Sequence, residues 1–133
     1  MRILNADNIV RIDQIKPYSK NAKKHSRKQI EQVAASIKEF GFNQPIVVDK
    51  DGVIIVGHAR YEAAKMLGLE DVPIQVVNLD KKKANAYRLA DNKLNESDWD
   101  MELVIEELKG LEDEALVALT GFEKDLLIEP DEK

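Results

Sequence analysis

The chain contains no cysteine among its 133 residues, and only 5% of its residues are aromatic. The absence of thiols excludes disulfide bridges, thiolate zinc sites and cysteine nucleophiles. Because aromatic side chains are scarce, the core must be built mainly from Ile, Leu, Val and Ala. The longest apolar stretches, such as residues 53–56, are far shorter than the roughly 20 residues that cross a bilayer. Together with the lack of a signal-type segment, these absences predict a cytoplasmic protein with no membrane partner.

Charge is abundant but unevenly distributed. Hydrophobic residues make up 44% of the chain and charged residues 34%, which suits one globular domain with a short extension. Residues 1–95 carry a net charge of +6, whereas residues 96–133 carry −11. Only the first part is therefore suited to nucleic acid or polyphosphate partners. We expect a basic domain over residues 8–97, an acidic helical extension over 98–127 and a frayed tail over 128–133.

Short β-branched runs alternate with apolar residues at helical spacing, which predicts a small α+β domain. Ser26, with Gln29 three positions later, marks the start of a helix that stops at Gly41. The runs at 45–48 and 53–56 predict a hairpin, because a turn-forming Asp-Lys-Asp-Gly sequence joins them. The other expected elements are strands near 8–12 and over 72–77, and helices over 59–67, from Asp80 to about Leu94, over 101–111 and over 114–119. The helix from Asp80 is expected to have one apolar face, formed by Ala86, Tyr87, Ala90 and Leu94. The helix over 101–111 is expected to face inward with Met101, Val104, Ile105, Leu108 and Leu111.

The junction after the second hairpin strand is the most informative place for chemistry. A helix begins directly after Gly57, and the free N–H groups of a first helical turn attract anions. The glycine permits close approach of a ligand to the backbone, and Arg60 can contact a phosphate with two donors. The alternative is a turn that only reverses the chain, with Arg60 solvated. His58 either donates to a phosphate or carries a proton, or it is a polar residue facing water.

Metal and nucleic-acid sites are indicated more weakly. His25 and His58 lack the spacing of metal ligands. Asp91 and Asn92 either supply oxygen ligands to Mg²⁺ alongside nucleotide phosphates or form a solvated helix face. The segment over residues 14–30, which carries six basic residues and no acidic one, either contacts nucleic-acid phosphates or is a solvated loop. Its candidate contact residues are Lys20, Lys23, Lys24, Arg27 and Lys28.

Several short motifs follow one another in a specific order and spacing. They are AASIKEFG at 34–41, QPIVV at 44–48, IVGHARYEAA at 55–64, and Gly-Leu and Val-Pro at 68–69 and 72–73. Through them, residues 12 to about 97 resemble the ParB/sulfiredoxin superfamily, often labelled the ParB-like nuclease or ParB N-terminal domain. The segments at 24–26, 90–94 and 119–122 are similar to ParB-like domains fused to phage-type DNA methyltransferases. The resemblance implies the α+β ParB/sulfiredoxin-like fold, here with an acidic helical extension, and a DNA methyltransferase module as a partner.

The resemblance also implies a nucleotide site. Partition ParB proteins bind CTP and Mg²⁺ in this domain and use them to close a clamp on DNA. Their Gly-Glu-Arg-Arg motif aligns with residues 57–60, which keep the glycine and the second arginine. Their Glu-Asn-x-Gln-Arg motif aligns with residues 91–95, which keep an acid and the asparagine that helps to hold the metal. The implied ligand is CTP or another nucleoside triphosphate with Mg²⁺, with Asp91 near the metal and the nucleotide held by Gln44, Pro45, Ile46, Gly57, His58, Ala59, Arg60 and Asn92.

Three functional classes stay open. The favoured class is a nucleotide-binding domain in a DNA-associated process such as DNA modification or partition. The second is an enzyme, namely a nuclease, nucleotide hydrolase or small-molecule kinase, with His58 and Arg60 as the candidate catalytic residues. The third is a non-catalytic interaction domain for a DNA methyltransferase. Sulfiredoxin chemistry is excluded, because His58 stands where the resemblance places the reductase cysteine.

Overall fold

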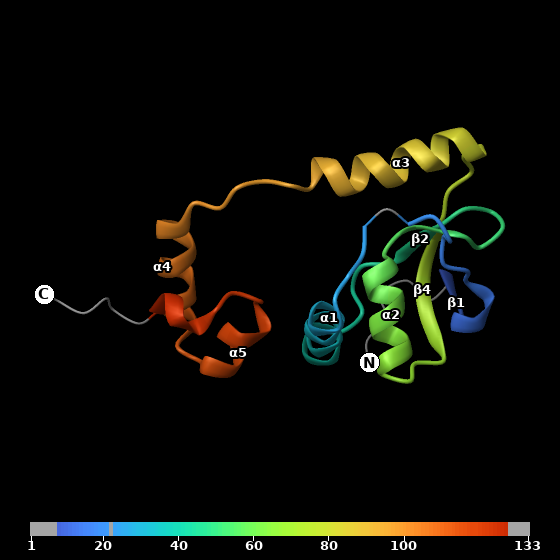
Figure 1. The fold of residues 1–133 in the computed structure, drawn as a ribbon. Coiled ribbons are helices and arrows are strands. Elements are labelled where there is room, and N and C mark those ends of the chain that lie inside the picture. Colours follow the sequence, from blue (N-terminus) through green and yellow to red (C-terminus); the bar gives the residue numbers. More distant parts are fainter. Residues whose placement is uncertain (1–7, 22, 128–133) are drawn as a thin grey trace, which may run out of the picture. The chain divides into compact units, whose positions relative to one another are not determined.

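The computed structural model of the protein describes residues 8–21 and 23–127, so the predicted frayed tail over 128–133 lies outside the described residues. The chain divides into two units, Met1–Glu96 and Ser97–Lys133. We call them the basic unit and the acidic unit. The elements of each are labelled in Figure 1.

A four-stranded sheet with the order β1-β4-β2-β3 forms the centre of the basic unit. Its strands are β1 (Ile9–Arg11), β2 (Ile46–Val48), β3 (Ile54–Val56) and β4 (Asp71–Val76). β4 pairs in parallel with β2 and antiparallel with β1, and β2 and β3 form the predicted antiparallel hairpin. Asp49 shapes the turn of this hairpin, because its Oδ1 accepts hydrogen bonds from the N–H groups of Asp51 and Val53.

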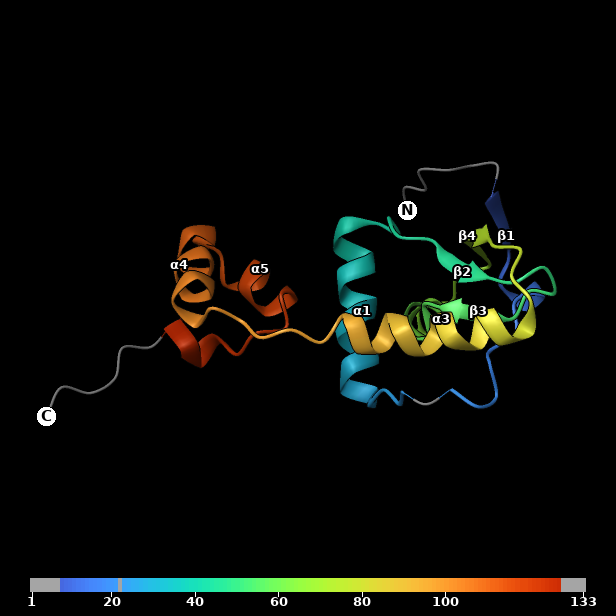
Figure 2. The same cartoon turned by 90° about the horizontal axis from the view of Figure 1, so that it is seen from above.

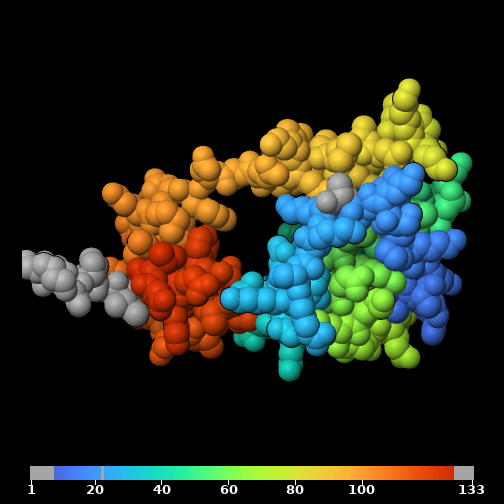
Figure 3. Space-filling model, viewed as in Figure 1, coloured from blue at the N-terminus to red at the C-terminus, as the bar shows by residue number. Residues whose placement is uncertain are grey.

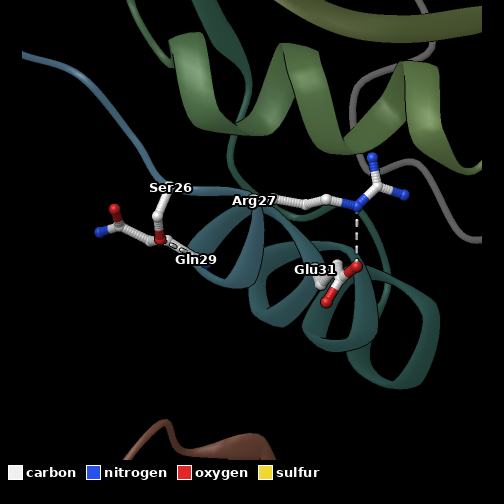
Figure 4. A network of polar contacts seen from close by, with 4 residues as sticks. All are labelled: Ser26, Arg27, Gln29 and Glu31. Carbon is white, nitrogen blue, oxygen red and sulfur yellow. Dashed lines mark hydrogen bonds and ion pairs between the residues drawn. The ribbon is translucent and has the colours of Figure 1, made fainter.

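The basic unit also contains α1 (Arg27–Phe40), α2 (His58–Met66), α3 (Lys81–Leu94) and a 3-10 turn, η2 (Ile12–Gln14). The predicted start of α1 is confirmed, since Ser26 Oγ accepts the N–H of Gln29 at 3.1 Å (Figure 4). Its predicted stop at Gly41 is also confirmed, with a φ of 95°. α1 packs against α2, and α3 runs along β3 (Figure 2). Within the described ranges, no helix is long and apolar enough to span a membrane.

The core of the basic unit is mainly aliphatic, as the composition predicted. The sheet and the first two helices contribute most of it, and Phe42 is its largest fully buried side chain. The buried cluster consists of Ile15, Ile30, Ala34, Ile37, Phe42, Ile46, Val48, Ile54, Tyr61, Ala63, Ala64, Val72 and Ile74.

The inward face of α3 differs from the predicted one. The apolar face predicted from Ala86, Tyr87, Ala90 and Leu94 is partly or fully exposed, and Leu94 is 81% exposed. The helix instead buries a neighbouring stripe that consists of Ala84 and Arg88. The prediction failed because it assumed that the packed face must be apolar, whereas here the packed side chain is an arginine.

The acidic unit contains α4 (Met101–Leu111), α5 (Glu114–Leu119) and a 3-10 turn, η3 (Lys124–Leu127), so both predicted helices are confirmed. Aspartates cap both helices. Of the five residues predicted to face inward on α4, Leu108 is buried, whereas Met101 and Leu111 are exposed. The rings of Trp99 and Phe122 meet edge to face, with 5.0 Å between their centroids.

Candidate functional site

A small cavity lies where β3 ends and α2 begins. Gly57 makes this turn with φ 110° and ψ 26°, a left-handed conformation that favours glycine. A Cβ atom at this position would lie 3.1 Å from Nη2 of Arg60 and 3.4 Å from the Cα atom of Ile46. The cavity, which we call the phosphate cavity, has a volume of about 160 Å³. It is lined by Asn21, Lys23, His25, Ile55, Val56, Gly57, His58, Ala59, Arg60, Asp91 and Asn92.

The guanidinium group of Arg60 is held in place at this cavity rather than solvated. Its Nη2 donates to the carbonyl oxygen of Pro45 at 3.0 Å, and its Nη1 contacts Oε1 of Gln44 at 3.5 Å. Its Nε is buried and has no hydrogen-bond partner. Burial lowers the pKa of Arg60, and the carboxylate of Asp91 opposes that shift. A buried donor without a partner is unfavourable, and an anion whose oxygen accepted a hydrogen bond from this Nε would remove that cost.

His58 is neutral and hydrogen-bonded. Burial, with smaller contributions from the positive charges of Arg88 and His25, lowers its pKa to about 4. Its Nε2 accepts a hydrogen bond from the N–H of Tyr18 at 3.2 Å. In a neutral imidazole the other nitrogen then carries the proton, so Nδ1 is the available donor. His58 is thus able to donate to an anion, and it is poorly suited to carrying a proton near neutral pH.

A wider groove adjoins the phosphate cavity and shares Asn21, Lys23, His25 and His58 with it. We call it the basic groove; its volume is about 830 Å³. Figure 3 shows the segment that leads into α1, in light blue, beside the green atoms of α2, whose first residue is His58. Lys23, Lys24 and Arg27, three of the predicted nucleic-acid contacts, line the groove. The other lining residues are Pro17, Tyr18, Ile30, Glu62, Lys65 and Met66.

The remaining predicted residues are placed less directly. Lys20 lines a neighbouring cavity of about 150 Å³, whereas Lys28 is exposed and lines none of these cavities. Ile46 is 0% exposed and does not line the phosphate cavity, so neither its side chain nor its backbone is accessible to a ligand in this structure. Gln44 and Pro45 contact Arg60 rather than the cavity itself. The two residues hold the guanidinium in position, and their role at a nucleotide stays a prediction.

Arg88 is the important residue that sequence reasoning missed. Its guanidinium donates from Nε to the carbonyl oxygen of Ile54 at 2.9 Å and from Nη1 to Oδ1 of Asn85 at 2.7 Å. Its Cζ lies 3.7 Å from the centroid of the Tyr18 ring, a cation–π contact. The sequence did contain a pattern that could have indicated its burial. Arg88 lies four residues after Ala84, so the two residues share one face of the helix.

Asp91 and Asn92 of α3 line the phosphate cavity together with the first residues of α2, and their side chains carry oxygen atoms. Oxygen ligands of this kind suit Mg²⁺, which usually keeps several waters and binds through substrate phosphates. Within residues 8–21 and 23–127, no group of three or more His, Cys, Asp or Glu side chains could hold a metal ion. The donor set therefore fits a Mg²⁺ ion that arrives with a nucleotide, and does not fit a metal held by the protein alone.

Comparison with known proteins identifies the family. Residues 4–93 match the model of the ParB N-terminal domain, so the chain belongs to that family. The ParB-like nuclease domain-containing protein YnaK of Escherichia coli is 42% identical over 67 residues, which cover 50% of this chain and 77% of YnaK. The probable chromosome-partitioning protein ParB of Rickettsia bellii is 34% identical over 103 residues, which cover 77% of this chain and 34% of that protein. The chain thus spans about a third of this partition relative.

Solved structures confirm the predicted fold. The C-terminally truncated ParB of Caulobacter crescentus, complexed with CTP-gamma-S, aligns with a TM-score of 0.69 at 24% identity, over 81% of this chain and 63% of that one. Sulfiredoxin from Arabidopsis thaliana aligns with a TM-score of 0.50 at 24% identity, over 59% of this chain and 94% of that one. Likeness at this identity establishes a shared α+β fold, and the function of this chain has to be argued from its own residues.

Proposed function

We propose that residues 8–97 form a domain that binds a nucleoside triphosphate of the CTP type together with Mg²⁺, and that it acts in a DNA-associated process such as partition or DNA modification. The observation that carries the proposal is the unsatisfied Nε of Arg60 beside a cavity at the start of α2. The proposal is supported by ParB of Caulobacter crescentus, which has been solved with CTP-gamma-S and with the centromeric parS site.

The proposed binding mode uses groups from two helices, α2 and α3. The first-turn N–H groups of α2 and the guanidinium of Arg60 take the phosphate oxygens. Neutral His58 donates from Nδ1. On α3, Asp91 and Asn92 hold Mg²⁺ together with the phosphates. The positive end of the helix dipole and the arginine act in the same direction, so the site is selective for anions.

Calorimetric titration of the full chain with CTP, ATP and GTP, with Mg²⁺ or with EDTA, tests the proposal. We expect Arg60→Ala to raise the Kd about 10- to 100-fold, because it removes charge-assisted hydrogen bonds. Arg11→Ala is the matched control, since Arg11 is exposed and its ion pair with Asp13 lies elsewhere in the unit. No binding of any of the three nucleotides at millimolar concentration would refute the proposal.

We further propose that DNA is contacted along the basic groove. Lysine and arginine side chains dominate its charged lining, with Glu62 opposing them. Fluorescence anisotropy with duplex DNA over a range of salt concentrations is the test. The double variant Lys23→Gln, Lys24→Gln should bind more weakly and with a shallower salt dependence, because fewer counterions are released. The matched control changes the exposed residues Lys38 and Lys50 to Gln. Equal binding by the two double variants would contradict the proposal.

The enzymatic alternative, a nuclease or kinase that uses His58 and Arg60, receives less support from the geometry. A general base needs an imidazole nitrogen that is free to accept a proton, and Nε2 of His58 already accepts a hydrogen bond from Tyr18. Incubation with plasmid DNA, or with ATP and serine, tests activity directly, with His58→Ala as the variant that must abolish it. A methyltransferase partner for the acidic unit and a cytoplasmic location stay predictions from the sequence.

A further inference from the structure

Arg88 carries the only buried charge in the part of the chain that the structure describes, and it is 6% exposed. None of the ion pairs among the described residues involves it. Burying a charge without an opposite charge is unfavourable unless hydrogen bonds compensate for it. Here the compensation comes from the carbonyl oxygen of Ile54, the side chain of Asn85 and the ring of Tyr18. Burial lowers the pKa of Arg88, and the carboxylate of Asp49 also favours the charged form and opposes that lowering. Arg88 therefore joins α3, β3 and the segment between η2 and α1, which contains Tyr18, at one point.

Tyr18 is held from two directions. Its ring lies against the guanidinium of Arg88, and its backbone N–H donates to Nε2 of His58, the first residue of α2. Its carbonyl oxygen accepts the N–H of Asn21 at 3.2 Å. Asn21 lines the phosphate cavity, as do Lys23 and His25 farther along the segment. We call the contacts among Tyr18, Arg88 and His58 the Tyr18 latch.

We propose that Arg88 is a positioning residue that, through the Tyr18 latch, holds Asn21, Lys23 and His25 at the phosphate cavity and thereby sets the affinity for the nucleotide. This inference rests on the proposed function and adds a residue that acts through Tyr18 rather than on the ligand. Arg88 also lies one turn before Asp91 and Asn92 on α3. One helix therefore positions two walls of the cavity, one through its own side chains and the other through the latch.

The pair Tyr18→Ala and Tyr18→Phe tests the latch with little risk to the core. Phe keeps the ring, and among the described residues the Tyr18 hydroxyl makes no hydrogen bond that Phe would lose. Ala removes the cation–π contact and keeps the backbone N–H. Arg88→Met, which removes the charge and the donors but keeps the length, serves as a second variant from the other side of the contact.

Two kinds of measurement are made on the full chain. Hydrogen exchange at the amides of residues 18 and 21, together with the ¹⁵N shifts of the His58 ring, reports the latch without any nucleotide. Calorimetry then gives the Kd for CTP with Mg²⁺. We expect Tyr18→Ala to speed exchange at both amides, to release Nε2 of His58 and to raise the Kd about tenfold, the loss expected for a desolvated cation–π contact. Tyr18→Phe should stay within about twofold of the unaltered protein on the same reasoning.

The outcomes separate this inference from the proposed function. If the unaltered chain binds no nucleotide, the proposed function itself fails. If the unaltered chain binds and Tyr18→Ala binds equally well, the positioning role is refuted while the nucleotide site stands. Unchanged exchange and unchanged His58 signals in Tyr18→Ala would likewise refute the latch. A weakened Kd that appears with Tyr18→Ala and Arg88→Met, and not with Tyr18→Phe, supports it.

Discussion

The helices of the basic and acidic units begin with similar caps, but the two units have hydrophobic cores of very different size. Ser26 and Asp80 cap helices in the basic unit, as Asp100 and Asp113 do in the acidic unit. In the basic unit the helices pack on a sheet and share a continuous core, whereas Leu108 and Val117 are the buried apolar residues among those described in the acidic unit. Small apolar cores stabilise little on their own. Local helix signals therefore do not indicate which unit is the more stable, or which unit holds a site that depends on a rigid core.

The largest expected effect tests that difference in core size. Phe42→Ala should lower the free energy of unfolding of the basic unit by about 3–5 kcal/mol, because Phe42 is 1% exposed and packs in the main cluster. Val117→Ala removes fewer carbon atoms from a smaller cluster and should cost about 1–2 kcal/mol.

The single tryptophan makes this measurement selective. Trp99 lies in the acidic unit, so its fluorescence reports that unit during denaturant unfolding, while circular dichroism reports mainly the basic unit. Phe42→Ala should shift the circular dichroism transition and Val117→Ala the fluorescence transition. Equal shifts of both signals in both variants would show that the two units do not differ in the way argued.

Local signals account for what the sequence could predict. The cap at Ser26, the stop at Gly41 and the hairpin turn at Asp49 depend on neighbours a few residues away, so their patterns sufficed. The hydrogen bond of Arg60 to Pro45 spans 15 positions, and that of Arg88 to Ile54 spans 34. Such contacts depend on how the elements pack, which no local pattern specifies. The cavity lies at the turn after Gly57, which a local pattern marks, so its place could be predicted. The Tyr18 latch depends on long-range packing, so it could not.

The two ends of α2, within the basic unit, differ in the same way. Gly57 and Gly68 both have positive φ, so Ala should strain each by about 1–2 kcal/mol. A Cβ atom at Gly57 would also meet Arg60 and Ile46, whereas one at Gly68 meets no atom within 4 Å. Both variants should therefore lose stability, and only Gly57→Ala should also lose nucleotide affinity in calorimetry. Equal nucleotide affinity of the two variants would place the site elsewhere.

The third prediction uses pH to separate the units. The pKa of His58 is about 4 in the folded protein, below its ordinary 6.5, so the unfolded chain takes up the proton first as pH falls. The contribution of His58 to stability is thus complete above pH 6.5 and declines towards pH 4, by about 1 kcal/mol once solvent screening is allowed for.

His58→Gln is the control for this effect, because the Gln side-chain oxygen can still accept the Tyr18 N–H. Denaturant midpoints at pH 7 and pH 5 should converge in the variant for the circular dichroism transition. The Trp99 transition should show no difference between the variant and the unaltered chain. A His58-dependent shift of the Trp99 signal would mean that the two units are energetically coupled.

The smallest expected effect concerns the surface of the basic unit. Arg27 Nε lies 3.1 Å from Glu31 Oε2 on an exposed turn of α1 (Figure 4). Glu31→Gln should change the free energy of unfolding by only about 0.3–0.5 kcal/mol, the usual size of such a pair, whereas Ser26→Ala one turn earlier should cost about 1 kcal/mol. Because Arg27 lines the basic groove, removing its partner charge should also strengthen duplex DNA binding slightly at low salt. Fluorescence anisotropy at two salt concentrations measures that gain. Weaker DNA binding by Glu31→Gln would instead show that the ion pair with Glu31 is needed to orient Arg27 towards DNA.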